Sequence, residues 1–237
     1  MEQTFVTYPI ELTLALSFIL GLVVGSFLNV VIYRLPLQMQ NSWRRDARDF
    51  LGQEPVEAET KFSLVYPPSR CTSCETLIKP WHNIPLIGYI LLKGRCKSCA
   101  APISLQYPAV ELTCALLTVA VVYHFGFTAQ AALAMFFTWV LVALTGIDVN
   151  HQLLPDNLTL PLLWLGLLVN MSATFVPLAD AVAGAVAGYM VLWLVYWGFK
   201  LITGKEGMGH GDFKLLAALG AWLGWQQLPM IILLSSA

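Results

Sequence analysis

The stretch LTCALLTVAVVYHFGFTAQAALAMFFTWVLVALTGI, residues 112–147, contains 36 consecutive residues without a Lys, Arg, Asp or Glu side chain. About 20 apolar residues are enough for a helix to cross the hydrocarbon core of a bilayer. The stretch is therefore too long for one span, and it predicts two spans joined by a tight turn. We expect that turn at His124-Phe125-Gly126-Phe127.

A second apolar run lies near the N-terminus. Residues 12–33 carry no charge over 22 positions and end at YRLP, residues 33–36. The aromatic ring and the cation of this motif are typical of a membrane interface, and its proline predicts the end of the helix. No small-residue cleavage site follows the run, so it is interpreted as a retained helix rather than a signal peptide.

The C-terminal half contains three more apolar segments. Two spans are predicted at residues 157–179 and 181–199, with Pro177 and Asp180 marking the turn between them. The last run is interrupted by two glutamines and a proline at residues 226–229. It predicts either one kinked span or a half-helix followed by the start of another helix. The chain stops inside this run, so a further C-terminal piece is expected.

The composition agrees with a membrane protein. Hydrophobic residues make up 57% of the chain and charged residues only 11%, and the mean hydropathy is +0.68. Ordinary soluble domains are about 25% charged, so the composition indicates that a lipid bilayer surrounds most of the chain. The net charge is −1, which gives no basic surface for nucleic acid, and no nucleic-acid partner is expected.

The positions of the cations predict the orientation. Ten of the 13 Lys and Arg residues lie between Arg34 and Lys97. The positive-inside rule therefore places this loop in the cytoplasm and the N-terminus outside. Counting spans from there brings the connections at residues 148–156 and 200–214 to the cytoplasmic side as well. Within the loop, residues 43–51 predict a helix that either lies on the membrane surface or connects two parts in solvent.

Four of the five cysteines form two Cys-x-x-Cys pairs: Cys71 with Cys74, and Cys96 with Cys99, separated by 21 residues. Paired knuckles at this spacing are typical of a structural zinc site with four thiolate ligands. Two disulfides or a redox dithiol are the alternatives, and a cytoplasmic location favours zinc because thiols stay reduced there. The fifth cysteine, Cys114, is expected to be a small buried residue, and His82 a loop residue rather than a ligand.

Two carboxylates form the candidate catalytic pair. Asp148 ends the third predicted span, and Asp212 follows the glycine-rich run GMGHG, which includes Gly209 and Gly211, and precedes an apolar run. Two carboxylates that share a proton can activate a water and protonate a scissile carbonyl, as aspartic proteases do. Three structural alternatives remain open. Asp212 could simply cap a helix, Asp148 could be a solvated residue that pairs with a lysine, and Asp156 is expected to be a helix cap rather than a catalytic residue.

These motifs together resemble the aspartyl membrane peptidases, and in particular the type IV prepilin leader peptidases. The resemblance covers nearly the whole chain. Besides the two cysteine pairs, the motifs that carry it are GSFLNVVIYRLP at 25–36, NIP at 83–85, QYP at 106–108 with Glu111, ID at 147–148, LPD at 154–156, KEGMG at 205–209 and GDFKL at 211–215.

The resemblance implies an activity that spacing alone does not give. Members of this family cut the basic leader from prepilins and pseudopilins at the cytoplasmic face of the bacterial inner membrane. Many also methylate the new N-terminal residue with S-adenosylmethionine. Motif matching assigns the catalytic roles to Asp148 and Asp212 and places the family's cysteine-bearing cytoplasmic domain in the loop after the first span. Family members usually continue through more membrane helices after the position of Ala237.

The sequence thus predicts an all-α polytopic membrane protein with a small cytoplasmic zinc-binding domain inserted after the first transmembrane helix. The expected domains are the first helix with a periplasmic N-terminus (1–35), the zinc-binding domain (36–107) and a membrane peptidase core (108–237). The alternatives are a proton-coupled transporter that uses Asp148 and Asp212, and a non-catalytic assembly factor that carries the zinc module. A transporter would place polar residues deep in several spans, whereas the mid-span regions here are almost entirely apolar.

Overall fold

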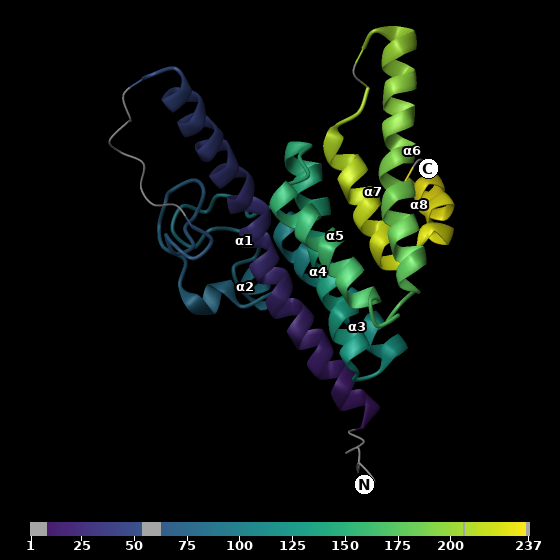
Figure 1. The fold of residues 1–237 in the computed structure, drawn as a ribbon. Coiled ribbons are helices and arrows are strands. Elements are labelled where there is room, and N and C mark those ends of the chain that lie inside the picture. Colours follow the sequence, from purple (N-terminus) through teal and green to yellow (C-terminus); the bar gives the residue numbers. More distant parts are fainter. Residues whose placement is uncertain (1–8, 54–62, 206, 236–237) are drawn as a thin grey trace. The chain divides into compact units, whose positions relative to one another are not determined.

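The computed structural model describes residues 9–53, 63–205 and 207–235, and they form two compact units (Figure 1). The N-terminal unit is Met1–Asn150 and the C-terminal unit is His151–Ala237. The regular elements of the described segments are all helical: α1 Ile10–Phe50, η1 Pro80–Asn83, α2 Ile87–Leu91, α3 Gln106–Phe125, α4 Ala129–His151, α5 Asp156–Asn170, α6 Leu178–Thr203, α7 His210–Leu223, η2 Trp225–Gln227 and α8 Leu228–Ser235.

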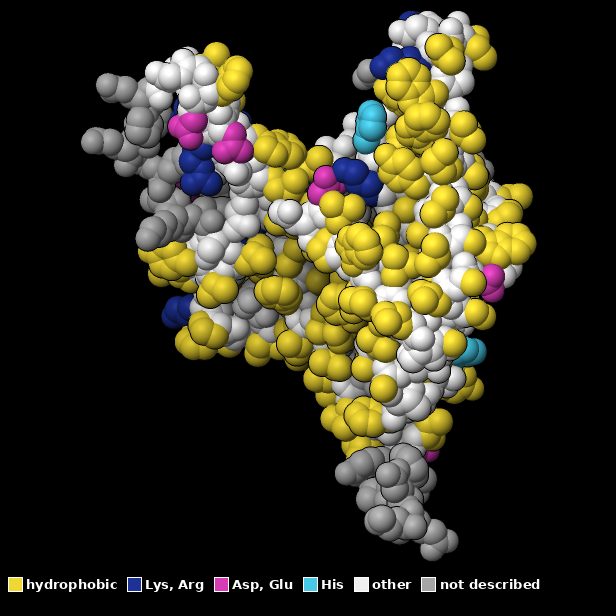
Figure 2. Space-filling view, viewed as in Figure 1, with side chains coloured by type: hydrophobic (Ala, Val, Ile, Leu, Met, Phe, Trp, Pro, Cys, Tyr) yellow, Lys and Arg dark blue, Asp and Glu magenta, His cyan; other side chains and the backbone are white. Residues whose placement is uncertain are grey.

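Four helices, α1, α3, α4 and α6, are long and apolar enough to cross a membrane. The predicted pair of spans in residues 112–147 is confirmed, because α3 ends at Phe125 and α4 begins at Ala129. Gly126 makes the turn between them with a φ of 68°, a conformation that favours glycine. Hydrophobic side chains cover the visible face of α6, as expected for a lipid-facing helix (Figure 2).

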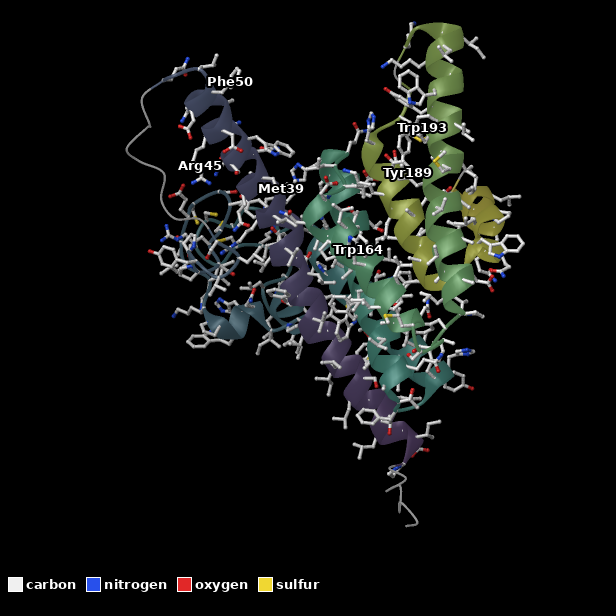
Figure 3. The ribbon with its side chains drawn as sticks, in the orientation of Figure 1. Met39, Arg45, Phe50, Trp164, Tyr189 and Trp193 are labelled. Atoms are coloured by element: carbon white, nitrogen blue, oxygen red, sulfur yellow. The ribbon has the colours of Figure 1, made fainter. Side chains whose placement is uncertain are left out.

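The expected end of the first helix at Pro36 is wrong. The helix α1 runs through Pro36 to Phe50, so the predicted helix near residues 43–51 is the C-terminal part of α1 (Figure 3). Proline in a helix removes one backbone hydrogen bond, but Arg34, two residues earlier, anchors this part of the helix to the following loop. The Arg34 guanidinium donates hydrogen bonds to the carbonyl oxygens of Ser63, Leu64 and Pro67, at 2.6–3.2 Å.

Small residues let α1 and α3 pack closely. Gly21 and Gly25, one turn apart, lie against the α3 backbone, where a Cβ on Gly25 would come within 2.7 Å of the Cα of Glu111. Such glycine pairs allow the close helix contacts on which packing in membranes depends. Cys114 lies in this contact and is fully buried, which confirms its predicted role.

The C-terminal unit contains a second close pair, α6 and α7. Gly184 and Gly188 of α6 pack against the backbone of Gly220 and Leu216 of α7, so the two helices run antiparallel. The helix α5 packs along α7 in the same direction. As a result, the N-termini of α5 and α7 and the C-terminus of α6 lie at one end of this unit, which we call the polar end.

The predicted span at residues 157–179 is too long. The helix α5 ends at Asn170 after 15 residues, about 22 Å, and the chain turns before α6 begins. Asn170 is the physical reason for this end. Its fully buried amide accepts hydrogen bonds from the backbone N–H groups of Phe175 and Val176 and donates to the carbonyls of Ala221 and Trp222.

The last apolar run is the second of the two predicted alternatives, a half-helix followed by another helix. The helix α7 ends at Leu223, and Gly224, with a φ of 80°, turns the chain before α8. The Asn170 amide satisfies two of the backbone carbonyls that the end of α7 leaves without helical partners. The indole N–H of Trp222 donates to the carbonyl of Leu162, which fixes α7 against α5.

Candidate functional site

Asp212 lies in the first turn of α7, at the polar end of the C-terminal unit. The N-cap of α7 is Gly209, so the predicted alternative that Asp212 itself caps the helix is wrong. Its Oδ2 points back toward Gly209, 3.8 Å from where a Cβ on that glycine would lie. Gly211 packs against Leu154, and a Cβ there would come within 2.8 Å of the Leu154 Cβ. Without side chains, Gly209 leaves room for the Asp212 carboxylate, and Gly211 lets the backbone of α7 lie close to Leu154.

An aromatic cluster from α6 and α7 holds this turn in place. The ring centroid of Tyr196 lies 5.2 Å from His210 and 5.7 Å from Phe213, and Tyr189 lies 5.9 Å from Phe213. Phe213 is fully buried. Because Phe213 adjoins Asp212 in sequence, its burial fixes the start of α7 while the carboxylate next to it stays partly accessible.

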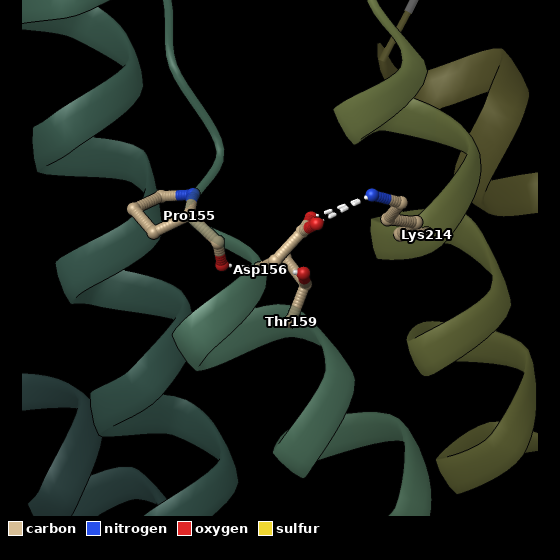
Figure 4. A network of polar contacts seen from close by, with 4 residues as sticks. All are labelled: Pro155, Asp156, Thr159 and Lys214. Carbon is tan, nitrogen blue, oxygen red and sulfur yellow. Dashed lines mark hydrogen bonds and ion pairs between the residues drawn. The ribbon is translucent and has the colours of Figure 1, made fainter. Parts of the chain in front are cut away.

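Asp156 is not the helix cap that the sequence predicted. It is the first residue of α5, the N-cap is Pro155, and no side-chain cap is formed. Instead, its two carboxylate oxygens accept hydrogen bonds from the Lys214 ammonium, each at 2.7 Å (Figure 4). Both side chains are partly exposed, so the pair contributes little stability, about 0–1 kcal/mol, but it joins the N-termini of α5 and α7.

Asp148 lies in the last turn of α4, in the N-terminal unit. The helix continues to His151, three residues beyond the predicted end of the span. Ile147 beside it is fully buried, whereas Asp148 is exposed. The two candidate catalytic residues thus belong to different units, and their pairing stays a prediction.

The two cysteine knuckles have the same backbone geometry. In the first, the N–H of Cys71 donates to the carbonyl of Thr76, and in the second the N–H of Cys96 donates to that of Ala101. Each Cys-x-x-Cys turn is followed by a residue in the left-handed region, Glu75 or Ala100. Each turn presents both of its sulfurs on one side.

The four sulfurs converge as a metal site requires. All lie within 4.8 Å of one another, with Cys71 Sγ 3.8 Å from Cys99 Sγ and Cys74 Sγ 4.0 Å from Cys96 Sγ. A zinc–sulfur bond of about 2.3 Å places the sulfurs of a tetrahedron about 3.8 Å apart. The cysteines are free thiols, which argues against the disulfide alternative. The cluster can therefore hold a metal ion, and His82 is not part of it.

The pKa values of the thiols show why such a cluster fits a cation. Hydrogen bonds with the Thr76 hydroxyl and backbone lower the pKa of Cys74 to about 6. The backbone of Cys99 and Ser98 lowers the pKa of Cys96. For Cys99, the backbone N–H of Ala101 favours the thiolate, but the sulfur of Cys74 and burial outweigh it and raise the pKa to about 11. A bound metal cation would offset the repulsion from the neighbouring sulfurs that keeps the proton on Cys99.

The sequence matches two family models, one for each half of the chain. Residues 19–125 match the bacterial peptidase A24 N-terminal domain, and residues 135–237 match the type IV leader peptidase family. The chain is 58% identical over 220 residues to a prepilin leader peptidase/N-methyltransferase from Stutzerimonas stutzeri, an alignment that covers 93% of this chain and 76% of the relative.

The chain belongs to the type IV leader peptidase family.

Two other family members with the same description are similar over most of their length. The protein from Pseudomonas aeruginosa is 55% identical over 97% of this chain and 79% of its own. The protein from Neisseria gonorrhoeae is 47% identical over the whole chain and 82% of its own length. No solved structure matches the chain. The four knuckle cysteines fall in the first family model, and Asp148 and Asp212 fall in the second.

Three buried polar residues join segments around the candidate sites, and reasoning from the sequence alone missed their roles. Asn170 fixes α5 to α7, and Asn29 donates a hydrogen bond to the carbonyl of Tyr107, at 3.0 Å. Glu111, 8% exposed, accepts a hydrogen bond from the backbone N–H of Leu86, at 2.8 Å. A buried polar residue inside an apolar run is costly unless it is paired, and this signal could have identified Asn29 and Asn170.

Proposed function

We propose that this protein is the leader peptidase that its family membership indicates, and that it cuts the basic leader from prepilins or pseudopilins at the cytoplasmic face of the bacterial inner membrane. The observation that carries the proposal is the similarity over 93–100% of the chain to relatives described as prepilin leader peptidase/N-methyltransferase. A transporter or a non-catalytic assembly factor would not account for this similarity.

In the proposed mechanism, Asp148 and Asp212 act as one acid/base pair. One carboxylate takes a proton from the attacking water, and the other, protonated, donates a hydrogen bond to the scissile carbonyl. Asp212 suits an anionic role because an acidic side chain in the first turn of a helix is favoured by the helix dipole. The glycines around it leave room for the backbone of an extended substrate to approach.

We further propose that the protein methylates the new N-terminus of its product with S-adenosylmethionine, which supplies the methyl group. The description of the relatives as N-methyltransferases supports this second activity. No residues are assigned to the S-adenosylmethionine site.

The metal of the cysteine cluster is proposed to be a structural zinc ion. The spacing of the sulfurs matches a zinc tetrahedron, and four thiolates leave no coordination position for water or substrate. In this proposal Cys71, Cys74, Cys96 and Cys99 hold the loop together and take no part in peptide hydrolysis.

The proposed function is tested by Asp148→Asn and Asp212→Asn in the purified protein, incubated with a prepilin in detergent. Each substitution should abolish leader cleavage, because neither carboxylate can replace the other. The double variant should be no worse than either single one, since the two residues act as a unit. Leader loss and methyl transfer are followed by mass spectrometry, and methyl transfer onto a pre-cleaved pilin is expected to survive.

Two Asp→Asn controls lie in the C-terminal unit, together with Asp212. Asp156→Asn breaks an exposed ion pair, and Asp180→Asn changes a residue whose carboxylate accepts a hydrogen bond from Trp225 at the opposite end of the unit. Both should retain most of the cleavage activity. If Asp148→Asn or Asp212→Asn cleaved prepilin at a near-normal rate, the aspartyl mechanism would be wrong.

A further inference from the structure

The short helix α2 and its flanks expose a group of large apolar side chains in the cysteine-bearing loop. Ile87, Ile90 and Leu91 of α2 are 53%, 70% and 68% exposed, and Trp81 of η1 is 56% exposed. Figure 2 shows hydrophobic side chains both over this part of the loop and along α1. A surface of this kind in water would be unfavourable, so it needs an apolar partner.

The contacts of the loop show how deep α2 lies along the helices. The N–H of Leu86, the residue before α2, is bonded to the carboxylate of Glu111, and Glu111 packs against Gly25 of α1. Gly25 lies nine residues before Arg34, a distance of about 13 Å along the helix axis. Figure 1 likewise shows α2 beside the middle of α1, on the side of the described loop away from the helix's C-terminal end.

At this depth α1 itself faces lipid. Val23 and Phe27, on either side of Gly25, are 56% and 52% exposed and belong to the charge-free part of the helix. The apolar side chains of α2 are therefore continuous with a surface that the membrane covers.

The N–H groups at the start of α2 are paired within the protein, as an apolar environment requires. In lipid, every backbone polar group needs a partner within the protein. The N–H groups of Ile87, Gly88 and Ile90 donate to the carbonyls of Pro85, Ile84 and Leu86. The N–H of Leu86 finds its acceptor only in Glu111, which gives a physical reason for a carboxylate inside α3.

Charges and an aromatic ring border this apolar face. The Lys79 ammonium lies 5.3 Å from the ring centroid of Trp81, and Lys93 and Arg95 line the surface next to this ring. Tryptophan and cations are enriched where a membrane meets water, and the cations attract anionic lipid headgroups.

We propose that α2 and η1 are immersed in the bilayer leaflet on the side of the cysteine cluster, with Ile87, Ile90 and Leu91 in the acyl region and Lys79, Lys93 and Arg95 at the headgroups of anionic lipids. The loop is thus a membrane-inserted module rather than a domain in free solution. This insertion fixes the depth of the metal site beside α1.

The test uses the full chain in vesicles of phosphatidylethanolamine and phosphatidylglycerol. A carbene-forming probe that partitions into the acyl region labels the protein, and mass spectrometry locates the label. Residues 87–91 should be labelled to an extent similar to that of the lipid-facing part of α1, because the side chains in the two places are similarly exposed. Phe50 and Leu51, which are 91% and 65% exposed at the far end of α1, are the matched apolar control and should stay nearly unlabelled.

Two variants sharpen the test. Ile90→Asp should lower the labelling of residues 87–91 several-fold, because a carboxylate avoids the acyl region. Val65→Asp, at a site near Arg34 that is 86% exposed against 70% for Ile90, should leave the labelling unchanged. Labelling of residues 87–91 no higher than that of Phe50 would overturn the proposal. Protection of these residues from both the carbene and a water-borne oxidant would overturn it as well, because a second protein or a second copy would then cover the face.

Discussion

At the scale of single residues, one amide determines where three segments meet. Asn170 ends α5, holds the start of the following turn and satisfies two carbonyls at the end of α7. Its side chain is fully buried and makes all of its hydrogen bonds within the protein. Buried polar groups of this kind contribute mainly through the cost of leaving their partners unpaired.

We therefore expect Asn170→Leu to destabilise the protein strongly although leucine keeps the branched shape of the side chain. The substitution leaves two N–H groups and two carbonyls without these partners, which costs about 2–4 kcal/mol, as estimated from unpaired buried groups. Thermal unfolding of the purified protein in detergent measures the effect. Ser172→Ala, in the exposed turn nearby, is the control and should change little; equal unfolding temperatures for the two variants would contradict this account.

The cysteine cluster supports a second prediction at this scale. The purified protein should hold about one zinc ion per chain, as four converging thiolates form one closed site. The double variant Cys71→Ser with Cys96→Ser, which removes one ligand from each knuckle, should lose the metal. Cys114→Ser, outside the cluster, should keep it. Elemental analysis measures the zinc content of each variant, and full zinc content in the double variant would exclude the site.

The residues differ in how far the sequence could predict them. The knuckle cysteines converge as predicted, because their spacing alone encodes the geometry. The role of Asp156 was predicted wrongly, since its partner Lys214 is 58 residues away and no local pattern connects them. The role of Asn170 was unpredictable for the same reason, because the carbonyls that it binds lie on α7, far away in the sequence.

At the scale of elements, the same device joins a helix pair in each unit. Two glycines one turn apart on α1 face α3, and two on α6 face α7. Water does not drive helices together inside a bilayer, so close van der Waals contact must do so. The glycines of α6 thereby determine where α7, and with it Asp212, lies against the aromatic cluster.

This packing predicts opposite effects for two glycines of α6. A Cβ on Gly188 would lie 2.6 Å from the carbonyl oxygen of Leu216, whereas one on Gly198 would meet nothing within 4 Å. Gly188→Ala should cost about 1–3 kcal/mol through overpacking. Gly198→Ala should be neutral or stabilise the helix by up to about 1 kcal/mol. Unfolding temperatures in detergent test both, and a Gly188→Ala protein as stable as the Gly198→Ala protein would show that the contact is unimportant.

The sequence predicted the helices best in the long runs that contain no charged residue. The charge-free run at residues 112–147 predicted α3, α4 and their turn correctly, because length alone separates one span from two. The continuation of α1 beyond Pro36 and the early end of α5 were not predictable in this way. Both depend on hydrogen bonds to distant segments, from Arg34 to the loop and from Asn170 to α7.

At the scale of the whole molecule, the arrangement of charge predicts an orientation. The C-terminal unit places Asp156, Lys200 and Asp212 toward its polar end, since α5 and α7 begin there and α6 ends there. This agrees with the span count, which puts the connections at residues 148–156 and 200–214 on one side. Lys61, which the sequence also assigns to the inside, lies outside the described residues.

The orientation is testable with single cysteines and a membrane-impermeant maleimide applied to intact cells. Phe127, 89% exposed between α3 and α4, is a better outer site than Gly126, whose φ of 68° would strain a cysteine. Phe127→Cys should be labelled from outside, and Lys205→Cys only after the membrane is opened, because the positive-inside rule places the lysine-bearing connection in the cytoplasm. In intact cells the buried Cys114 gives no background, and the four knuckle cysteines lie on the inner side with Lys205. Labelling of Lys205→Cys but not Phe127→Cys in intact cells would invert the topology and put Asp212 on the wrong side of the membrane for a cytoplasmic leader.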